Sequence, residues 1–360
     1  MAFKLSIYPW VHSARFNGDG WDEEYIEQEH MTPEEENAMS EADHTALVNK
    51  RNNFPHLPLV NYTTQYGLGC FEGLKAFPQP DGSLKLFRPD RNCRRMASSM
   101  KGLMMPPIDE SLLLEGIIGT VRRNADLGFA PSYDPEWEKD SWQSGGAVYI
   151  RPFAYSEPGI GINLSRAPWV ITVCTTVSAY FTPGKNEAVT SQRVRATPKG
   201  TGWIKAAANY VTSTLAKTEA IQAGFMEAIF LDAATQKNIE EGSSCNFFAL
   251  FPGGKLVTPS LHDTILPGIT RESVMRLAEE RGLDVVERDL AVSEVLDDAV
   301  ECFVTGTAAG ITPLGSLTHQ GQKGVFSSLK DDSLSMSLLR ELKGIQYGAV
   351  KDRHGWMKDV

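Results

Sequence analysis

The chain has 360 residues, of which 42% are hydrophobic and 22% charged, and its formal net charge at pH 7 is −10. This length and composition are typical of a water-soluble globular protein with two domains of ordinary size. No apolar run approaches the roughly 20 residues that span a membrane, and the acidic balance argues against a nucleic-acid-binding protein, which presents a basic face.

Residues 1–56 are predicted to form an acidic N-terminal arm. Residues 14–55 are polar and include a run of three glutamates at 34–36. A run of like charges is ordinarily a solvated surface, so this segment is expected to be irregular apart from a short helix after Pro33. The sequence assigns no function to the arm.

Residues 57–180 are predicted to form a small N-terminal α+β domain. Turn and strand signals run through residues 60–87, with a hairpin turn at 80–82. Amphipathic helices are expected at 90–104 and 110–126, and strands at 146–155 and 169–178.

Residues 181–189 combine polar residues with proline and glycine and are the predicted interdomain linker. Residues 190–360 are predicted to form a larger C-terminal domain. Its expected helices are 209–224, 271–282 and 333–346, and its expected strands are 227–232, 246–251, 255–259, 284–290 and 301–305. Sheet and helix alternate without an internal repeat, which favours an α+β fold of two domains with a ligand site in the cleft between them.

Lys205 lies among small and apolar neighbours in residues 201–210, at the expected start of a helix. A charged lysine is rarely buried without a partner. Desolvation favours the neutral amine, which can attack a carbonyl carbon and form a Schiff base. The alternative, a lysine on the solvated face of an amphipathic helix, is the ordinary explanation for a single residue.

Several segments have the composition of anion sites. Residues 265–271 run through Pro-Gly into a helix that Thr270 is expected to cap, and a free helix N-terminus binds phosphate. Residues 305–310 form a small-residue turn whose N–H groups can bind a second anion. Arg88 and Arg151 each end an apolar strand before a proline and can present a guanidinium to phosphate or carboxylate. Capping turns and solvated arginines remain the alternatives.

Glu241 lies in an acidic turn just before an apolar strand. It is either a solvated loop residue or a carboxylate that keeps a ring nitrogen protonated. One lysine, one buried carboxylate and two anion sites together suit pyridoxal phosphate, because they would serve the imine, the pyridinium, the phosphate and the substrate carboxylate.

Other sites are not indicated. The five cysteines are scattered and never form a C-x-x-C pair, which is typical of free thiols in a reducing compartment. The apolar residues 5–11 are broken by Pro9 and do not resemble a signal peptide, so a cytoplasmic location is expected. There is no H-E-x-x-H or metal-spaced His/Cys cluster, so no metal site is predicted. Residues 67–73 have the spacing G-x-G-x-x-x-G, which is not that of a dinucleotide loop.

Nine segments together resemble the branched-chain amino-acid aminotransferases, which are pyridoxal-phosphate enzymes of fold-type IV. The segments are residues 66–77, 86–89, 149–152, 179–181, 205–210, 241–246, 265–271, 305–308 and 345–348. The resemblance runs from about Tyr62 to Trp356 and implies a two-domain architecture with the active site between the domains. It also implies reversible, ping-pong transamination of L-leucine, L-isoleucine and L-valine with 2-oxoglutarate, giving branched-chain 2-oxo acids and L-glutamate.

The resemblance implies a role for each matching residue at the cofactor. Lys205 would be the catalytic residue that forms the Schiff base with pyridoxal phosphate and moves the proton. Glu241 would pair with the pyridine nitrogen, and Tyr210 would hydrogen-bond the phenolic oxygen of the ring. Arg88 and backbone N–H groups of the two anion segments would hold the phosphate. The full implied cofactor-binding set is Arg88, Lys205, Tyr210, Glu241, Ser244, Leu266, Gly268, Ile269, Thr270 and Thr307.

The implied substrate site surrounds the same lysine. Tyr149 and the turn amides would bind the α-carboxylate, and Arg151 would receive the distal carboxylate of glutamate. Phe71, Tyr180 and Tyr210 would form the wall for an aliphatic side chain. The implied substrate-binding set is Tyr66, Phe71, Tyr149, Arg151, Tyr180, Thr307 and Ala308.

Two of these residues also imply an assembly. Tyr66 and Phe71 match residues that reach the site of the neighbouring subunit, so a homodimer is expected, and neither nucleic acid nor membrane is an expected partner.

The sequence departs from the family at some positions and leaves rival activities open. Ala309 and Thr312 replace a redox C-x-x-C that some members carry, and residues 206–208 are alanines where glycine is commoner. D-amino-acid transaminases, R-selective amine transaminases and aminodeoxychorismate lyases share the lysine and the glutamate. Residues 71–77 and 149–152 favour the branched-chain class. A binding protein that kept the fold without the cofactor would be expected to have lost Lys205 or Glu241.

Overall fold

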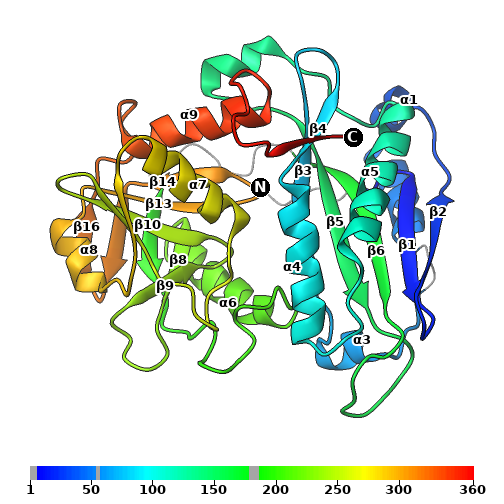
Figure 1. The fold of residues 1–360 in the computed structure, drawn as a ribbon, viewed down its shortest axis with the longest axis horizontal. Coiled ribbons are helices and arrows are strands. Elements are labelled where there is room, and N and C mark those ends of the chain that lie inside the picture. Colours follow the sequence, from blue (N-terminus) through cyan, green and yellow to red (C-terminus); the bar gives the residue numbers. More distant parts are fainter. Residues whose placement is uncertain (1–5, 54–56, 178–185) are drawn as a thin grey trace.

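The computed structural model of the protein describes residues 6–53, 57–177 and 186–360 (Figure 1). Its helices are α1 (Pro33–Ala38), α2 (Glu41–Asn52), α3 (Tyr62–Tyr66), α4 (Pro89–Gly102), α5 (Glu110–Asp126), α6 (Asn209–Gln222), α7 (Ile269–Glu280), α8 (Val292–Asp298) and α9 (Leu334–Gln346), with a 3-10 helix at Pro135–Asp140. Its strands are β1 (Trp10–Phe16), β2 (Trp21–Glu27), β3 (Leu74–Pro78), β4 (Leu84–Phe87), β5 (Ala147–Tyr155), β6 (Trp169–Val177), β7 (Glu187–Thr190), β8 (Glu227–Leu231), β9 (Ile239–Gly242), β10 (Asn246–Phe251), β11 (Lys255–Thr258), β12 (Asp284–Glu287), β13 (Glu301–Gly306), β14 (Gly310–Leu314), β15 (Ser316–His319), β16 (Gln322–Val325) and β17 (Met357–Asp359).

The first sheet has seven strands in the order β17-β4-β3-β5-β6-β1-β2. All its neighbouring pairs are antiparallel. Helices α4 and α5 pack together, and α5 covers β1, β5 and β6. Apolar residues at helical spacing on α4, such as Met96 and Met100, are fully buried with Leu74 and Leu86 of the sheet. This amphipathic spacing is the reason that the sequence predicts both helices.

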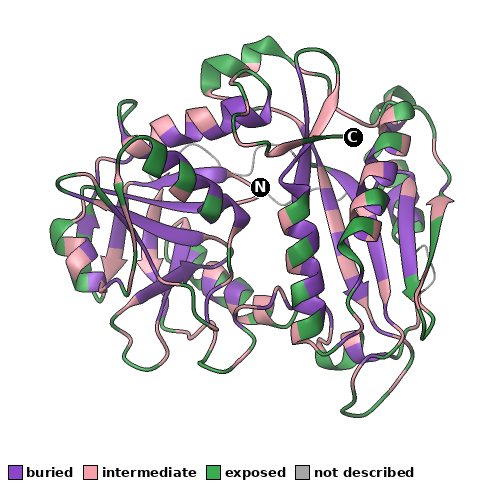
Figure 2. Cartoon of the chain, in the orientation of Figure 1, coloured by how far each residue is buried: buried purple, intermediate pink, exposed green. Residues whose placement is uncertain are grey.

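The second sheet has ten strands and is mixed. Its path is β12-β11-β10-β9-β8-β7-β15-β16, and β13 joins it by pairing with β10 and β14. Helices α7 and α9 pack on the β13 side, and α6 packs on β8. The strands of both sheets are largely buried (Figure 2).

One hydrophobic cluster joins the two sheets. Phe77 and Phe87 of the first sheet belong to the same buried cluster as Phe248, Phe303 and the apolar face of α9. The rings of Phe248 and Phe303 stack at 5.0 Å between centroids. This shared core fixes the two units against each other, with α4 of one facing α7 of the other (Figure 1).

The predicted α+β fold is confirmed, and the hairpin expected at 80–82 joins β3 to β4. The short helix predicted after Pro33 is confirmed as α1, but the prediction that the rest of the arm is irregular is wrong. β1 lies inside the first sheet between β2 and β6, and α1 and α2 follow it. The sequence does not indicate β1 as a strand, because two of its buried residues, His12 and Ser13, are polar. β2 is an edge strand whose carboxylates are exposed to solvent, so it lacks the apolar alternation of a half-buried strand.

Two further sequence predictions concern the linker and the thiols. Residues 178–185, which include most of the predicted linker, lie outside the described residues, and the predicted domain boundaries stay predictions. All five cysteines are free, as expected. Within the described ranges, no helix has the length and apolar character needed to cross a bilayer.

Candidate active site

Lys205 lies in the loop that precedes α6, and the helix itself begins only at Asn209. Two contacts with the first sheet unit fix this loop. The N–H of Phe71 donates to the carbonyl of Lys205 at 3.1 Å, and the N–H of Lys205 donates to Ser99 Oγ on α4 at 3.2 Å. Both units of the fold therefore set the position of the lysine.

The side chain of Lys205 is half-buried between two aromatic rings. Its Nζ donates to Tyr210 Oη at 2.8 Å and lies 5.1 Å from the ring centroid of Phe71. The rings of Phe71 and Tyr210 are 4.8 Å apart. The ring of Phe71 thus packs beside the lysine of its own chain, and its predicted reach into a neighbouring subunit's site stays a prediction.

A cavity of about 670 Å³ opens at Lys205. The predicted residues that line it are Tyr149, Arg151, Lys205, Tyr210, Ser244, Thr307 and Ala308. They come from β5, from α6 and the loop before it, and from the turns that follow β9 and β13. Segments that are far apart in the sequence thus meet here. Ile7 and Asn52 of the arm, and Val173 and Thr175 of β6, also line the cavity, although no motif pointed to them.

Arg151 and Tyr149 point to the same face of β5, because they are two residues apart on a strand. Arg151 Nη2 donates to Tyr149 Oη at 2.8 Å, and its guanidinium lies 4.7 Å from the ring centroid of Phe71. Arg151 Nε is buried and has no hydrogen-bond partner in the described part of the chain. Buried polar groups are nearly always paired, so this free donor indicates a ligand with an acceptor.

Gly73 has no side chain, and this leaves the space that the hydroxyl of Tyr149 occupies. A Cβ on Gly73 would lie 2.2 Å from Tyr149 Oη. No real side chain could be accommodated at that distance.

Glu241 is a buried carboxylate on β9. It forms an ion pair with Arg195 and accepts from Asn246 Nδ2 at 3.1 Å and from the N–H of Leu266 at 3.3 Å. Burial raises the pKa of Glu241 to about 7, although the charges of Arg195 and Lys205 oppose this shift. The site thus holds a carboxylate whose charge depends strongly on what lies beside it.

The helix N-terminus predicted from residues 265–271 is present, but Thr270 does not cap it. Gly268 occupies the N-cap in an extended conformation, and Ile269 and Thr270 are the first residues of α7. A Cβ on Gly268 would lie 1.9 Å from Asn246 Oδ1, so glycine is required there by close approach. Ile269, Thr270 and Thr307 line one small cavity, which brings the two predicted anion segments together.

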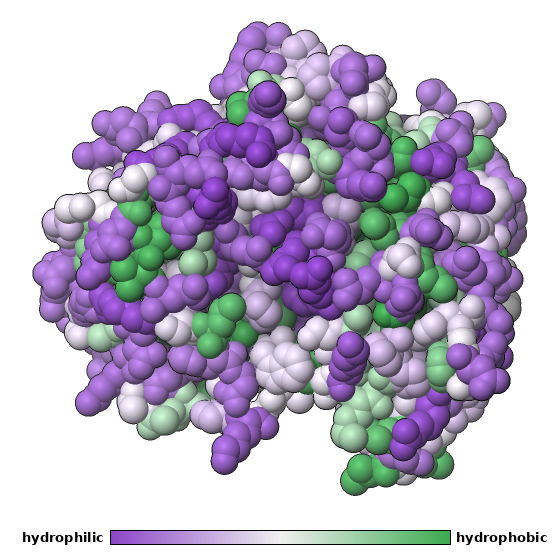
Figure 3. All heavy atoms as spheres, in the orientation of Figure 1, coloured by the Kyte–Doolittle hydropathy of each residue, from purple (hydrophilic) through white to green (hydrophobic). Residues whose placement is uncertain are grey.

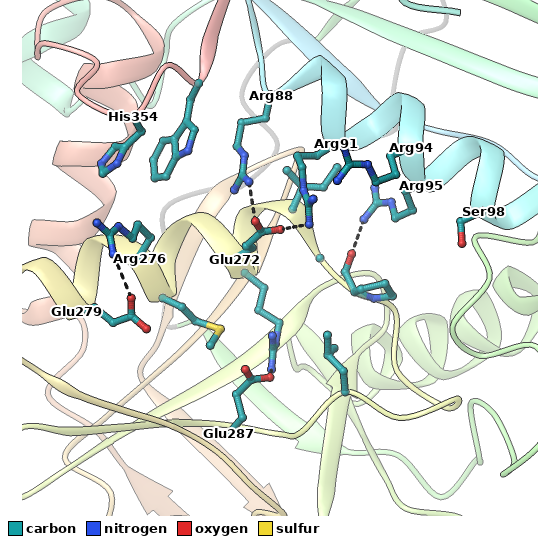
Figure 4. A pocket seen from close by; sticks show the side chains of 17 residues that line it. Arg88, Arg91, Arg94, Arg95, Ser98, Glu272, Arg276, Glu279, Glu287 and His354 are labelled. Carbon is teal, nitrogen blue, oxygen red and sulfur yellow. Dashed lines mark hydrogen bonds and ion pairs between the residues drawn. The ribbon is translucent and has the colours of Figure 1, made fainter. Parts of the chain in front are cut away.

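Arg88 is not placed with Lys205. Its guanidinium donates to Glu272 Oε1 at 2.7 Å and to Ser273 Oγ at 2.8 Å on α7 (Figure 4). It lines a separate groove between α4 and α7, beside Arg91, which pairs with the same glutamate. Gly268 and Ile269 of the predicted phosphate segment line the same groove, and the phosphate-binding role of Arg88 stays a prediction.

Arg95, on the next turn of α4, was missed. It makes a two-pronged ion pair with the fully buried Glu72, at 2.7 and 2.9 Å, and donates to the carbonyl of Pro267 at 2.9 Å. Burial opposes ionisation of Glu72, but Arg95 and then Lys205 hold its pKa below the usual value. No local sequence signal separates Arg95 from the other arginines of α4.

Lys75 is a second residue near the site that the sequence did not indicate. It is buried, and its Nζ donates to the carbonyl of Ala308 at 2.6 Å, which fixes the turn after β13. Burial, reinforced by the charge of Lys343, holds the pKa of Lys75 well below its usual value.

Of the predicted substrate residues that the structure describes, Tyr66 and Phe71 are not among those that line the cavity. Tyr66 is exposed on α3, where its hydroxyl accepts from the N–H of Gly161 at 2.8 Å. Tyr180 lies outside the described residues.

Comparison with known proteins gives a consistent picture. A family model described as amino-transferase class IV matches residues 69–317. A probable branched-chain-amino-acid aminotransferase of Staphylococcus epidermidis is 36% identical over 305 residues, which cover 82% of this chain and 81% of that protein. The branched-chain-amino-acid aminotransferase of Haemophilus influenzae is 37% identical over 317 residues, covering 85% and 88%.

Solved structures share the fold. The branched-chain amino acid aminotransferase of Escherichia coli superposes with a TM-score of 0.72 at 27% identity, over 85% of this chain and 94% of that one. The branched-chain aminotransferase of Thermoproteus uzoniensis with norvaline gives 0.69 at 26% identity, over 85% and 95%. The Thermobaculum terrenum enzyme in its PLP form gives 0.72 at 25% identity, over 98% and 99%.

Proposed function

Because the chain belongs to the branched-chain amino-acid aminotransferases of class IV, we propose that it exchanges the amino group of L-leucine, L-isoleucine or L-valine with 2-oxoglutarate. The enzyme is an aminotransferase of fold-type IV with pyridoxal phosphate as its cofactor. The observation that carries the finer proposal is Arg151, a cation with a free buried donor in an otherwise aromatic part of the cavity. Such a site suits both an aliphatic side chain and a carboxylate.

The residues around Lys205 fit the cofactor. When bound, pyridoxal phosphate supplies a carbonyl carbon that takes the lysine amine as a Schiff base, and a ring that accepts carbanion charge. Tyr210 Oη, 2.8 Å from Lys205 Nζ, would hydrogen-bond the phenolic oxygen of the ring. Glu241 would face the ring nitrogen. A protonated nitrogen there would add a positive charge beside this buried carboxylate and bring its pKa down again.

The phosphate is assigned to the N-terminus of α7. The N–H groups of Ile269 and Thr270 are free of intrahelical partners, and the helix dipole favours an anion there. Thr307 lines the same small cavity. Two guanidinium groups lie beside this turn: Arg95 donates to the carbonyl of Pro267, and the buried Arg88 donates to Ser273 Oγ on α7.

The substrate would meet two polar positions. Tyr149 and the amides of Thr307 and Ala308 would bind the α-carboxylate that both substrates share. The free edge of Arg151 would bind the distal carboxylate of 2-oxoglutarate or glutamate. With an aliphatic substrate, Tyr149 and the ring of Phe71 remain as partners of the guanidinium. This matters because a buried cation without partners costs several kcal/mol.

Lys205 would also carry the proton. Its Nζ would take the proton from the substrate Cα and would deliver it to the C4′ carbon of the cofactor. The hydrogen bond to Tyr210 keeps that nitrogen oriented toward the cavity.

A homodimer is part of the proposal, supported by an exposed apolar cluster at α3. Leu59 is 84% exposed and Ile162 fully exposed, with Val60, Tyr66 and Ile160 beside them. The bond between Tyr66 and Gly161 joins the two segments that carry this cluster, and hydrophobic atoms gather at this end of the molecule (Figure 3). Contiguous exposed apolar surface marks an interaction site.

A cytoplasmic location is also proposed, and the thiols support it. All five cysteines are free, and burial raises the pKa of the thiols of Cys70, Cys93 and Cys174 far above the usual value. Free, inert thiols are typical of a reducing compartment.

The test is the visible absorbance of the purified enzyme loaded with pyridoxal phosphate. L-Leucine without an acceptor is expected to bleach the cofactor band, and 2-oxoglutarate to restore it with release of L-glutamate. A band that does not respond to leucine would refute the proposal and favour a lyase or an amine transaminase. Release of D-glutamate would identify a D-amino-acid transaminase.

A further inference from the structure

The arm contributes to the wall of the active-site cavity. Ile7 is only 5% exposed, and it lines the same cavity as Lys205 and Arg151. Alternate residues of two neighbouring strands line the cavity, namely Tyr149 and Arg151 on β5 and Val173 and Thr175 on β6. Ile7 precedes β1, the next strand in the sheet order after β6. It therefore extends the substrate-facing side of the sheet by one more position.

A buried arginine holds Ile7 in place. Arg51 on α2 is 2% exposed, and its Nη1 donates both to the carbonyl of Ile7 at 3.0 Å and to Glu36 at 3.0 Å. Its Nε donates to the carbonyl of Glu29 at 2.9 Å. Three distant segments of the arm thus converge on one guanidinium. On the other side, the N–H of Tyr8 donates to the carbonyl of Cys174 on β6 at 2.9 Å.

We infer that Ile7 limits the length of the aliphatic side chain that the enzyme accepts, and that Arg51 is the positioning residue that fixes it. This inference rests on the proposed function, because it concerns the substrate of that site. Ile7 is suited to the role because a β-branched side chain has one strongly preferred rotamer and forms a stiff wall. Its backbone is bound on both sides, so it cannot retreat from a longer substrate.

The experiment measures how chain length affects binding and turnover in the loaded enzyme. Butyrate, hexanoate and octanoate are used as unreactive probes in calorimetry. L-Norvaline, L-norleucine and L-2-aminooctanoate are used as amino donors with 2-oxoglutarate. Ile7→Ala is expected to raise the preference for the longest probe over the shortest about tenfold, the effect of a methylene or more of pocket space. Ile7→Phe is expected to lower it by a similar factor.

Leu47→Ala is the matched control. Leu47 lies on α2 of the same arm and is buried to nearly the same extent, but it does not line the cavity. The Leu47→Ala variant is expected to prefer the longest probe over the shortest to the same extent as the natural enzyme. If Ile7→Ala does not fold, Ile7→Val removes a single methyl group and gives the same trend at smaller amplitude.

The outcomes separate the inference from the proposed function. An enzyme with natural Ile7 that neither transaminates leucine nor binds the probes refutes the proposed function. An active enzyme whose length preference is unchanged, within about twofold, in both Ile7 variants refutes the inference alone. A change of equal size in Leu47→Ala also refutes it, because the effect would then come from loosening the arm in general.

Discussion

Arg151→Met separates the two half-reactions. The substitution removes the guanidinium but keeps an apolar side chain of similar length over Phe71. Without the guanidinium, the distal carboxylate of bound 2-oxoglutarate would be buried with no cation beside it. Removing one partner of a buried, hydrogen-bonded charge pair costs about 2–5 kcal/mol, or roughly 30-fold to a few thousand-fold in kcat/KM. The leucine half-reaction is expected to change by less than about fivefold, because Arg151 then serves no carboxylate.

Single-turnover absorbance measures each half-reaction separately. The loaded enzyme is mixed with leucine alone, and the aminated enzyme is mixed with either 2-oxoglutarate or 4-methyl-2-oxopentanoate. Arg151→Lys is the control, since it keeps the charge but not the planar fork, and an intermediate loss with 2-oxoglutarate is expected. Equal losses with both oxo acids would refute the role assigned to Arg151.

Four further perturbations test other parts of the site and fold. Lys205→Ala is expected to slow the leucine half-reaction by at least about 10²–10⁴-fold, and mass spectrometry after borohydride reduction should then find no cofactor attached to the chain. The pKa of Glu241 is raised in the folded, cofactor-free protein, so its contribution to the free energy of unfolding is lost as the pH rises from 4.5 to about 7. Urea melts should show that the natural protein loses about 3 kcal/mol of unfolding free energy over this range relative to Glu241→Gln. Arg51→Met should cost about 3–5 kcal/mol in thermal melts because Glu36 is left unpaired, and Glu36→Met in the same protein should restore most of it. Ile162→Asp should yield monomers in analytical ultracentrifugation, and an unchanged mass would remove the α3 cluster from the interface.

Local patterns predicted the parts of the site that sequence neighbours determine. Tyr149 and Arg151 share a face because strand geometry requires it. The helices that became α4 and α5 follow from apolar residues at helical spacing. Lys205 was recognisable by its small neighbours, and the helix that follows it begins at Asn209, as predicted, after Ala206 has paired with Cys70 in a β-bridge.

Long-range contacts decided the parts that the sequence could not predict. The partners of Arg88 and Arg95 could not be predicted, because Glu72, Glu272 and Pro267 lie outside α4 and are brought to it only by the fold. The arm was misjudged for the same reason. Its polar edge strand becomes regular only because the first sheet offers it a partner.

The cap of α7 is a third case. Thr270 has the right side chain for a helix cap, but Asn246 of another strand crowds the turn so closely that only Gly268 fits at the N-cap.

The last strand gives the chain an unusual order of assembly during synthesis. β17 pairs with β4 at one edge of the seven-stranded sheet, whereas β2 forms the opposite edge. Nearly the whole second unit is made between β4 and β17. On the ribosome, β4 therefore waits with an open edge while that unit emerges, and an open edge can pair with another chain. Pairing with β17 then covers this edge, so we expect deletion of β17 to leave β4 as an open edge strand that can pair with another chain.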